Sequence, residues 1–213
     1  MMAALAVKDK FFWLTECTKT KDEQDQQEPY KPFPAKDYLR LTLDYLDNEP
    51  NPVKFIKKSR TMLASWVVTG WAAHTAFTRP ATKVVIQSRD EDTALTCIGY
   101  AKELWKNSLP ALKQQWRLEK ELDKQPDHEL TTASGSSIVA ITGDPNKIRS
   151  NHPTIVILDE AAFMDRGEES FNIAVATRCL HLVALSSAEP GWFEDLIETA
   201  NPVPWPEYGR AAA

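Results

Sequence analysis

The chain has 213 residues, of which 43% are hydrophobic and 26% charged, and its formal net charge is −5 at pH 7. This composition is typical of one globular domain that is long enough to bury a core. No apolar run approaches the roughly 20 residues of a membrane-spanning helix, and the N-terminus lacks a signal-peptide pattern, so we expect a soluble, unexported protein with no membrane partner. The acidic balance excludes the overall basic surface of an autonomous nucleic-acid-binding protein.

The three cysteines, Cys17, Cys97 and Cys179, are widely separated in the sequence. They are too few and too scattered for a disulfide framework or a CxxC metal site. We therefore expect a reducing, cytosolic setting and no structural metal.

Residues 1–34 are expected to form an arm or linker, because the segment Thr18–Pro34 is polar, charged and contains prolines. The core should begin after it, with an amphipathic helix over Asp37–Asn48 and a short strand from Val53 to Ile56. The largely apolar segment Thr61–Phe77 predicts a helix that is buried against a sheet.

A strand is expected over Lys83–Gln87, followed by a helix that Ser88 and Glu91 begin at capping-box spacing. Residues 129–134 and 137–142 predict a β-hairpin that turns at Gly135. Further expected elements are a strand over 154–160, a helix near 168–179, a strand over 181–187 and a helix around 192–200. Apolar strands that alternate with helices indicate a mainly parallel sheet covered on both faces.

The strongest chemical signal is the apolar strand Ile155–Leu158, which ends in the adjacent carboxylates Asp159 and Glu160. This is the Walker B pattern, in which one carboxylate holds the hydration shell of Mg²⁺ beside the β and γ phosphates and its neighbour activates the attacking water. We assign the first role to Asp159 and the second to Glu160. The alternative is that the pair begins a solvated loop or caps a helix.

The segment Phe55–Trp66 lies between a strand and a helix, where a phosphate-binding loop belongs, but it matches GxxxxGK[ST] poorly. If Ser65 is the Mg²⁺-binding hydroxyl, Leu63 replaces the usual glycine and Ala64 the usual lysine. The helix N-terminus still offers backbone N–H groups to phosphate, and Lys58 can supply an ammonium from the start of the loop. The alternative is a basic strand end on a solvated surface.

Four segments occur in an order that resembles the ATPase domains of tailed-phage large terminases: KSRTMLASW, VVIQSRDEDTA, IRSNHPTIVILDEAAFM and LSSAEPGWF. That family has a variant Walker A motif whose lysine stands at the front of the loop. The resemblance covers about Pro34–Glu198. It implies an α/β fold, a P-loop NTPase of the additional-strand (RecA-like) type, with a mainly parallel central sheet flanked by helices and a β-hairpin insertion.

The resemblance also implies individual roles. Ser65 and Asp159 would bind the metal, and Glu160 and Lys58 would be catalytic, together with Arg149 as a finger that reaches a neighbouring subunit. The residues that would bind ATP are Lys58, Ser59, Arg60, Thr61, Met62, Leu63, Ala64, Ser65 and Trp66. The motif that couples hydrolysis to movement would be Ser186, Ser187 and Ala188. On sequence alone, Arg149 is equally well a surface residue and the two serines an ordinary strand end.

Two departures from the family matter. Where members commonly carry a glutamine near the adenine, this chain has Lys36 and Asp37, and Phe33 or Tyr30 either stacks on the base or simply packs. Large terminases usually continue into a nuclease domain, which nothing after Trp205 provides. We therefore expect a truncated chain that does not cut DNA, with a motor domain over 35–210 and a cloning scar at 211–213.

The function that the resemblance implies is ATP hydrolysis with Mg²⁺ to drive double-stranded DNA into a viral procapsid in the host cytoplasm. The implied partners are the portal protein, the small terminase subunit and identical subunits in a ring, most simply a pentamer. A ring can grip DNA although each subunit is acidic, because basic side chains converge on its channel; Lys147 is a candidate contact, or merely solvated.

Two rival functions remain. A helicase-type motor would share Asp159 and Glu160 but should carry a second motor domain, and none is visible. A nucleotide-binding docking module without turnover is suggested by Leu63 and Ala64 in the phosphate loop.

Overall fold

A six-stranded sheet organises the computed structural model, which describes residues 1–21, 25–59, 62–187 and 189–199. Its strand order is β3-β8-β7-β4-β6-β5, and all neighbours are parallel except β5 and β6. The strands are β3 (Val53–Lys57), β8 (His181–Ser186), β7 (Ile155–Asp159), β4 (Lys83–Gln87), β6 (Ser137–Ile141) and β5 (Glu129–Thr131). The expected mainly parallel sheet and the expected hairpin are both confirmed.

The position of β8 determines the type of fold. It lies between β3, which leads into Lys58, and β7, which ends in Asp159. An extra strand between the phosphate-loop strand and the Walker B strand defines the additional-strand type, so the predicted RecA-like fold class is confirmed. Because β3, β8, β7, β4 and β6 are parallel, their carboxyl ends meet at one edge of the sheet, where ligands bind in open α/β folds.

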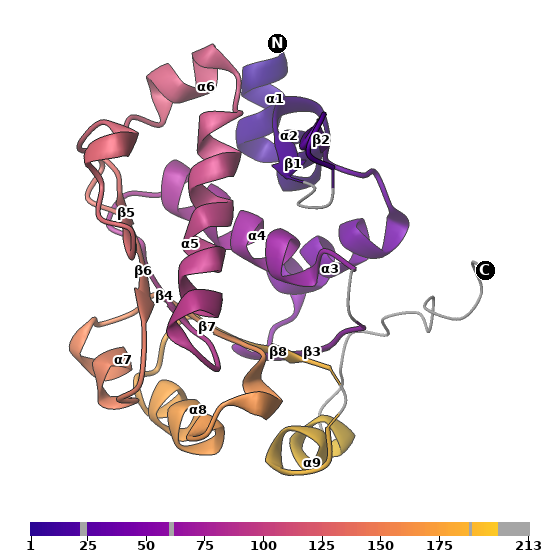
Figure 1. The fold of residues 1–213 in the computed structure, drawn as a ribbon, viewed down its shortest axis with the longest axis vertical. Coiled ribbons are helices and arrows are strands. Elements are labelled where there is room, and N and C mark those ends of the chain that lie inside the picture. Colours follow the sequence, from indigo (N-terminus) through magenta and orange to yellow (C-terminus); the bar gives the residue numbers. More distant parts are fainter. Residues whose placement is uncertain (22–24, 60–61, 188, 200–213) are drawn as a thin grey trace.

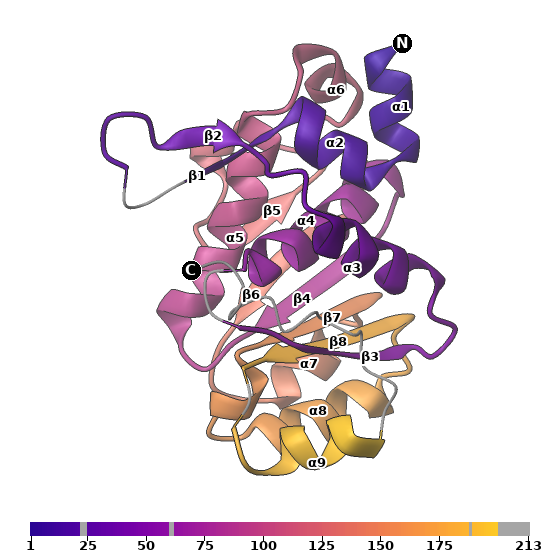
Figure 2. The same ribbon diagram turned by 90° about the vertical axis from the view of Figure 1, so that its right-hand side faces the viewer.

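Helices cover both faces of the sheet (Figures 1 and 2). One face carries α4 and α5, with the N-terminal helices outside them, and the other carries α7, α8 and α9. The helices are α1 (Met2–Lys8), α2 (Lys10–Cys17), α3 (Asp37–Asn48), α4 (Ala64–Thr78), α5 (Glu91–Lys106), α6 (Pro110–Gln115), α7 (Asn146–Ser150), α8 (Gly167–Ala176) and α9 (Trp192–Thr199). Smaller elements are the strands β1 (Lys19–Lys21) and β2 (Tyr30–Pro32) and the 3₁₀ turns η1 (Leu122–Lys124) and η2 (Ala161–Phe163). In the described part of the chain, no helix is long and apolar enough to cross a membrane.

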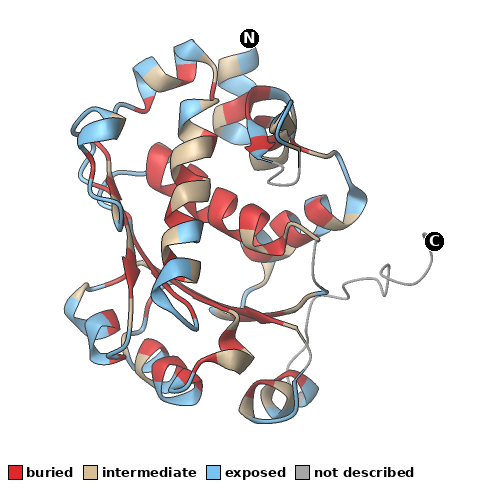
Figure 3. Ribbon diagram, viewed as in Figure 1, coloured by how far each residue is buried: buried red, intermediate tan, exposed pale blue. Residues whose placement is uncertain are grey.

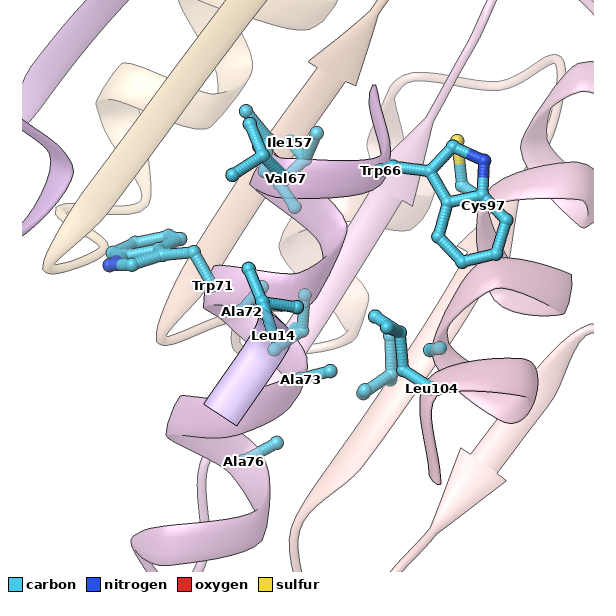
Figure 4. Close-up of a cluster of buried hydrophobic side chains, with 14 of the residues drawn as sticks. Leu14, Trp66, Val67, Trp71, Ala72, Ala73, Ala76, Cys97, Leu104 and Ile157 are labelled. Atoms are coloured by element: carbon cyan, nitrogen blue, oxygen red, sulfur yellow. The ribbon is translucent and has the colours of Figure 1, made fainter. Parts of the chain in front are cut away.

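Helix α4 is the centre of the larger core (Figures 3 and 4). It is largely apolar and buried on nearly every side, which is typical of a helix enclosed between a sheet and an outer helical layer. Val67 and Trp71 are buried, and Gly70 lets the side chains of Leu14 and Leu104 approach the helix backbone. The residues at the start of α4 are therefore held in place by a helix that is packed along most of its length.

The core begins earlier than we expected, and the structure corrects the view of residues 1–34 as only an arm. Trp13 and Leu14 of α2 are fully buried against α4, and Trp13 Nε1 donates a hydrogen bond to Ser108 Oγ at 3.1 Å. The polar run after Thr18 hides this contribution in the sequence. The apolar residues before it form α1 and α2, which cover α4.

The expected helices occur, but some of their ends shift by up to three residues and one predicted cap is wrong. The helix over Asp37–Asn48 is confirmed residue for residue, and α4 begins three residues later than expected, at Ala64. The capping box of Ser88 and Glu91 is wrong, because the N-cap of α5 is Asp90, whose carboxylate accepts a hydrogen bond from the backbone N–H of Thr93. The hydroxyl of Ser88 has another partner, described below.

Candidate functional site

Four polar side chains from separate segments meet where β3 and β7 end and α4 begins. Lys58 Nζ lies 3.0 Å from Asp159 Oδ1 and 3.1 Å from Glu160 Oε1. Ser65 Oγ lies 3.0 Å from both Lys58 Nζ and Asp159 Oδ1. The basic turn and the acidic pair, which the sequence placed 101 residues apart, therefore form one cluster.

This cluster is largely shielded from water. The side chains of Lys58 and Asp159 are only 9% and 4% exposed. Burial alone would lower the pKa of Lys58, but the charges and hydrogen bonds of Asp159 and Glu160 outweigh it and raise the pKa above its ordinary value. The lysine therefore stays charged, and each buried charge has an opposite partner, as burial demands.

The predicted phosphate loop contains a left-handed backbone turn that usually needs glycine, although no glycine is present. Leu63, in the usual glycine position, precedes α4 with φ of 56° and ψ of 20°, in the left-handed region. This conformation costs a residue with a side chain about 1–2 kcal/mol. Because the backbone still turns here, the first N–H groups of the 15-residue helix α4 remain available to an anion.

The other predicted phosphate-loop residues differ in what they can offer. Ser59 is exposed, Met62 is partly buried, and Arg60 and Thr61 lie outside the described residues. The ring of Trp66 is buried and stacked on Tyr100 with ring centroids 4.1 Å apart. Trp66 and Ala64 can therefore contribute to phosphate binding only through their backbone.

Asp159 has two further partners that the sequence analysis missed. Ser88 Oγ donates a hydrogen bond to the backbone carbonyl of Asp159 at 3.0 Å, and Cys97 Sγ lies 3.6 Å from Asp159 Oδ2. Burial and the neighbouring carboxylate raise the pKa of Cys97 well above its ordinary value. No sequence signal points to Cys97, whereas the position of Ser88 directly after a strand of the parallel sheet could have suggested the site edge.

Glu160 stands differently from Asp159. Its backbone also lies in the left-handed region, with φ of 52°, at the start of η2. Its side chain is 25% exposed, so it reaches both Lys58 and solvent. A carboxylate that is held by the backbone and open to water suits the predicted role of activating a water molecule.

The end of β8 links the cluster to the opposite face of the sheet. The backbone N–H of Lys58 donates to the carbonyl of Ser186 at 2.8 Å, while Lys57 forms an ion pair with Glu194 of α9. Ser186 is fully buried, and its hydroxyl has no hydrogen-bond partner among the described residues. Alternation along β8 places this hydroxyl on the same face as Ala184, which packs toward α9.

The remaining coupling residues are less defined. Ser187 is partly exposed just beyond β8, and Ala188 lies outside the described residues. The predicted coupling residues therefore lie at the end of β8, which is hydrogen-bonded to Lys58. The neighbouring residue Lys57 is ion-paired with Glu194 of helix α9.

Arg149 is not part of the cluster. It is exposed on α7 and borders an open depression of about 430 Å³ between α7 and α8, which Glu168 and Glu169 also line. Within the described residues, no hydrogen bond or ion pair joins Arg149 to Lys58 or the acidic pair. A role in its own subunit's site therefore has no support, and the role in a neighbouring subunit stays a prediction.

The residues considered for adenine binding lie on the N-terminal segment. Phe33 is 2% exposed within the larger core, which supports the packing alternative for this ring. Tyr30 is exposed on β2, and Lys36 and Asp37 begin α3. Among the described residues, none of the four forms a hydrogen bond or ion pair with the Lys58 cluster.

The oxygen donors of the cluster fit a magnesium ion. Two neighbouring ligands of an octahedral Mg²⁺ lie about 2.9 Å apart, since each is about 2.1 Å from the ion, and Ser65 Oγ and Asp159 Oδ1 are 3.0 Å apart. The described residues contain no group of three or more His, Cys, Asp or Glu side chains that could hold a metal by themselves. Mg²⁺ usually takes one or two protein ligands and completes its shell with phosphates and water.

Comparison with known proteins shows the fold. No family model and no curated protein matches the chain. Among solved structures, it is similar to the large terminase of bacteriophage HK97, with 12% identity and a TM-score of 0.66 over 92% of this chain and 42% of that one. It is also similar to the large terminase ATPase domain of Thermus phage P74-26, with 15% identity and a TM-score of 0.55 over 76% of this chain and 73% of that one. The chain, which spans less than half the length of the HK97 protein, therefore has the fold of a phage large terminase ATPase domain.

Proposed function

We propose that this chain is the ATPase of a DNA-packaging motor, which hydrolyses ATP with Mg²⁺ to move double-stranded DNA into a viral procapsid. The ATPase activity is proposed from one observation. Four side chains meet at the carboxyl ends of the parallel strands: Lys58, Ser65, Asp159 and Glu160. The likeness in fold to two phage large terminases supports the choice of DNA packaging among the uses of such a site.

In the proposed reaction, the N–H groups at the start of α4 and the ammonium of Lys58 bind the phosphates. Ser65 and Asp159 would hold Mg²⁺, which would supply positive charge against that of the phosphates. Glu160 orients and deprotonates the water that attacks in line. The Lys58–Glu160 ion pair suggests a sequence of events: when Lys58 turns toward phosphate, Glu160 is released from it and is free to contact the water.

Coupling of hydrolysis to movement would start at the same lysine. Because its backbone N–H is bonded to the carbonyl of Ser186, a shift of the phosphate turn pulls directly on the end of β8. We propose that Ser186, Ser187 and Ala188 respond to loss of the γ-phosphate in this way. The ion pair of Lys57 and Glu194 then offers a second connection from the same turn to α9.

The wider assembly is also part of the proposal. The motor domain would include helices α1 and α2, which pack on α4. It would work as a homo-oligomeric ring of five subunits with the portal protein and the small terminase subunit in the host cytoplasm. A ring reconciles the net charge of −5 with DNA binding, because basic side chains from several subunits line one channel. Arg149, exposed on α7, would reach the site of the next subunit.

The test is phosphate release together with nucleotide binding measured by calorimetry. Lys58→Ala should abolish both, whereas Glu160→Gln should retain binding and lower turnover by at least about 100-fold. Lys83→Ala is the matched control, because Lys83 is an exposed lysine at the amino end of β4, away from the carboxyl ends of the strands where the cluster lies. Wild-type turnover in Lys58→Ala, with thermal unfolding showing an intact fold, would overturn the proposal.

The same experiment distinguishes the proposed ATPase from a docking module that binds nucleotide without hydrolysing it. A docking module, which Leu63 and Ala64 in the loop suggest, would bind nucleotide but release no phosphate under any condition. If Arg149 acts in the neighbouring subunit, specific activity should rise with protein concentration and Arg149→Ala should remove that rise. Activity that is independent of concentration in a verified monomer would contradict the finger.

A further inference from the structure

We propose that Cys97 is a positioning residue for Asp159: its thiol donates a hydrogen bond to Oδ2 of the carboxylate and so keeps Oδ1 turned toward Ser65 and Lys58. The inference rests on the proposed function, because it gives Asp159 the role of holding Mg²⁺. It adds a residue from α5 that no motif contains.

The two oxygens of Asp159 have different surroundings. Oδ1 lies 3.0 Å from both Lys58 Nζ and Ser65 Oγ, on the side where phosphate and metal would bind. Oδ2 lies 3.6 Å from Cys97 Sγ, with Ser65 Oγ at 3.2 Å. A carboxylate oxygen only accepts, so a close thiol contact is favourable when the S–H group donates.

The main chain of Asp159 is held from the same part of the structure. Ser88, directly after β4, donates to the carbonyl of Asp159 at 3.0 Å, and Cys97 follows on the next helix, α5. Besides its contacts with Lys58 and Ser65, Asp159 is thus held at its backbone by the hydroxyl of Ser88 and at Oδ2 by the thiol of Cys97. Partners that orient a metal-binding carboxylate commonly change metal affinity by 10–100-fold when they are removed.

The alternative is that Cys97 only fills space. It is 1% exposed and belongs to the larger core, where Figure 4 draws it among the buried side chains of the helical layer, and a buried cysteine often acts as a small apolar residue. The two roles predict different responses. Space filling makes serine at least as harmful as alanine, because a hydroxyl is costly in an apolar core, whereas a donor role lets serine replace cysteine.

The first test measures how much Mg²⁺ is needed for half-maximal binding of a non-hydrolysable ATP analogue to the full chain. Cys97→Ala should raise that concentration about ten-fold, and Cys97→Ser should restore it to near the wild-type value. Cys179→Ala is the matched control, because Cys179 is also buried but its sulfur faces Ala174 O at 3.9 Å. Equal shifts in Cys97→Ser and Cys97→Ala, or no shift in Cys97→Ala, would overturn the inference.

A second test needs neither nucleotide nor turnover. In a chain with Cys17→Ala and Cys179→Ala, the S–H stretching band in the Raman spectrum comes from Cys97 alone. A donating thiol shifts this band to lower wavenumber, and the further change Asp159→Ala should move it to higher wavenumber, although the side chain of Thr69 remains beside the thiol. A band that Asp159→Ala leaves in place would refute the hydrogen bond even if the ATPase proposal stands. Conversely, failure of the ATPase proposal would leave this band shift intact.

Discussion

Acid should destabilise this protein through His74, a histidine that the proposed function does not use. His74 lies on α4 and is 3% exposed, with its ring 5.3 Å from that of Trp13 and 5.5 Å from that of Trp116. Its Nε2–H donates to the carbonyl of Ala6 at 2.8 Å, and its buried Nδ1 has no partner among the described residues. A proton on Nδ1 would therefore be a buried, unpaired donor on a charged ring.

The size of the effect follows from the pKa. Burial, above all, lowers the pKa of His74 from 6.5 to about 4. The unfolded chain therefore binds this proton first, so the stability that neutral His74 contributes is complete above about pH 6.5 and is lost as the pH falls toward 4. At about 1.4 kcal/mol for each pKa unit, the loss is about 2 kcal/mol at pH 5 and about 3 kcal/mol at pH 4. This is a large part of a typical unfolding free energy of about 5–15 kcal/mol.

The assay is urea unfolding at pH 7 and pH 5 for the wild type and for His74→Gln, which does not titrate in this range. The fall in unfolding free energy between these pH values should be about 2 kcal/mol larger for the wild type. His128→Gln, at an exposed histidine, should behave like the wild type. The same fall in wild type and His74→Gln would refute the reasoning, because other groups would then account for the acid sensitivity.

Three further substitutions test local geometry. Leu63→Val should weaken nucleotide binding more than Leu63→Gly, since a β-branched residue strongly disfavours the left-handed turn before α4; equal affinities in calorimetry would contradict this. Gly167→Ala should lower the unfolding free energy by about 1–3 kcal/mol, because the added Cβ would lie 2.6 Å from the carbonyl oxygen of Ala161. An unchanged urea midpoint would show that the backbone around Ala161 moves to make room for the methyl group. Trp71→Phe removes the 2.7 Å hydrogen bond from Nε1 to Asp47 and should cost about 1–2 kcal/mol in the same measurement, and a smaller loss would mean that water replaces the indole.

Much of the fold can be predicted from the sequence, because periodicity and chain punctuation are local signals. The helix over Asp37–Asn48 has apolar residues at helical spacing and the strand over Lys83–Gln87 an apolar run between turn residues, and both occur as expected. The site was predictable for a similar reason. In a parallel sheet, residues that follow strand ends converge at one edge, so Lys58 after β3 and Asp159 at the end of β7 had to lie near each other.

What could not be predicted depends on contacts between distant segments. The burial of α2 depends on α4, a largely apolar helix that needs a cover on the side away from the sheet. Ser88 was assigned to a helix cap because its nearest sequence signal is local, yet its partner is the carbonyl of Asp159. The left-handed turn at Leu63 is likewise imposed by the tertiary structure, since nothing in the residue itself favours it.

The charge balance of the cluster bears on the proposed ring. Lys58 and the two carboxylates together carry a net charge of −1, and Lys58 is the one cation bonded to them within the described residues. A polyanionic nucleotide would be repelled by such a site unless positive charge is added. Mg²⁺ adds two charges and the N-terminus of α4 about half of one, which is little for a triphosphate whose γ group gains negative charge during transfer. A guanidinium from outside the subunit would supply the missing charge at the moment of transfer without holding the nucleotide permanently. The acidic character of the site therefore supports the proposal that Arg149, exposed on α7, acts in the site of a neighbouring subunit.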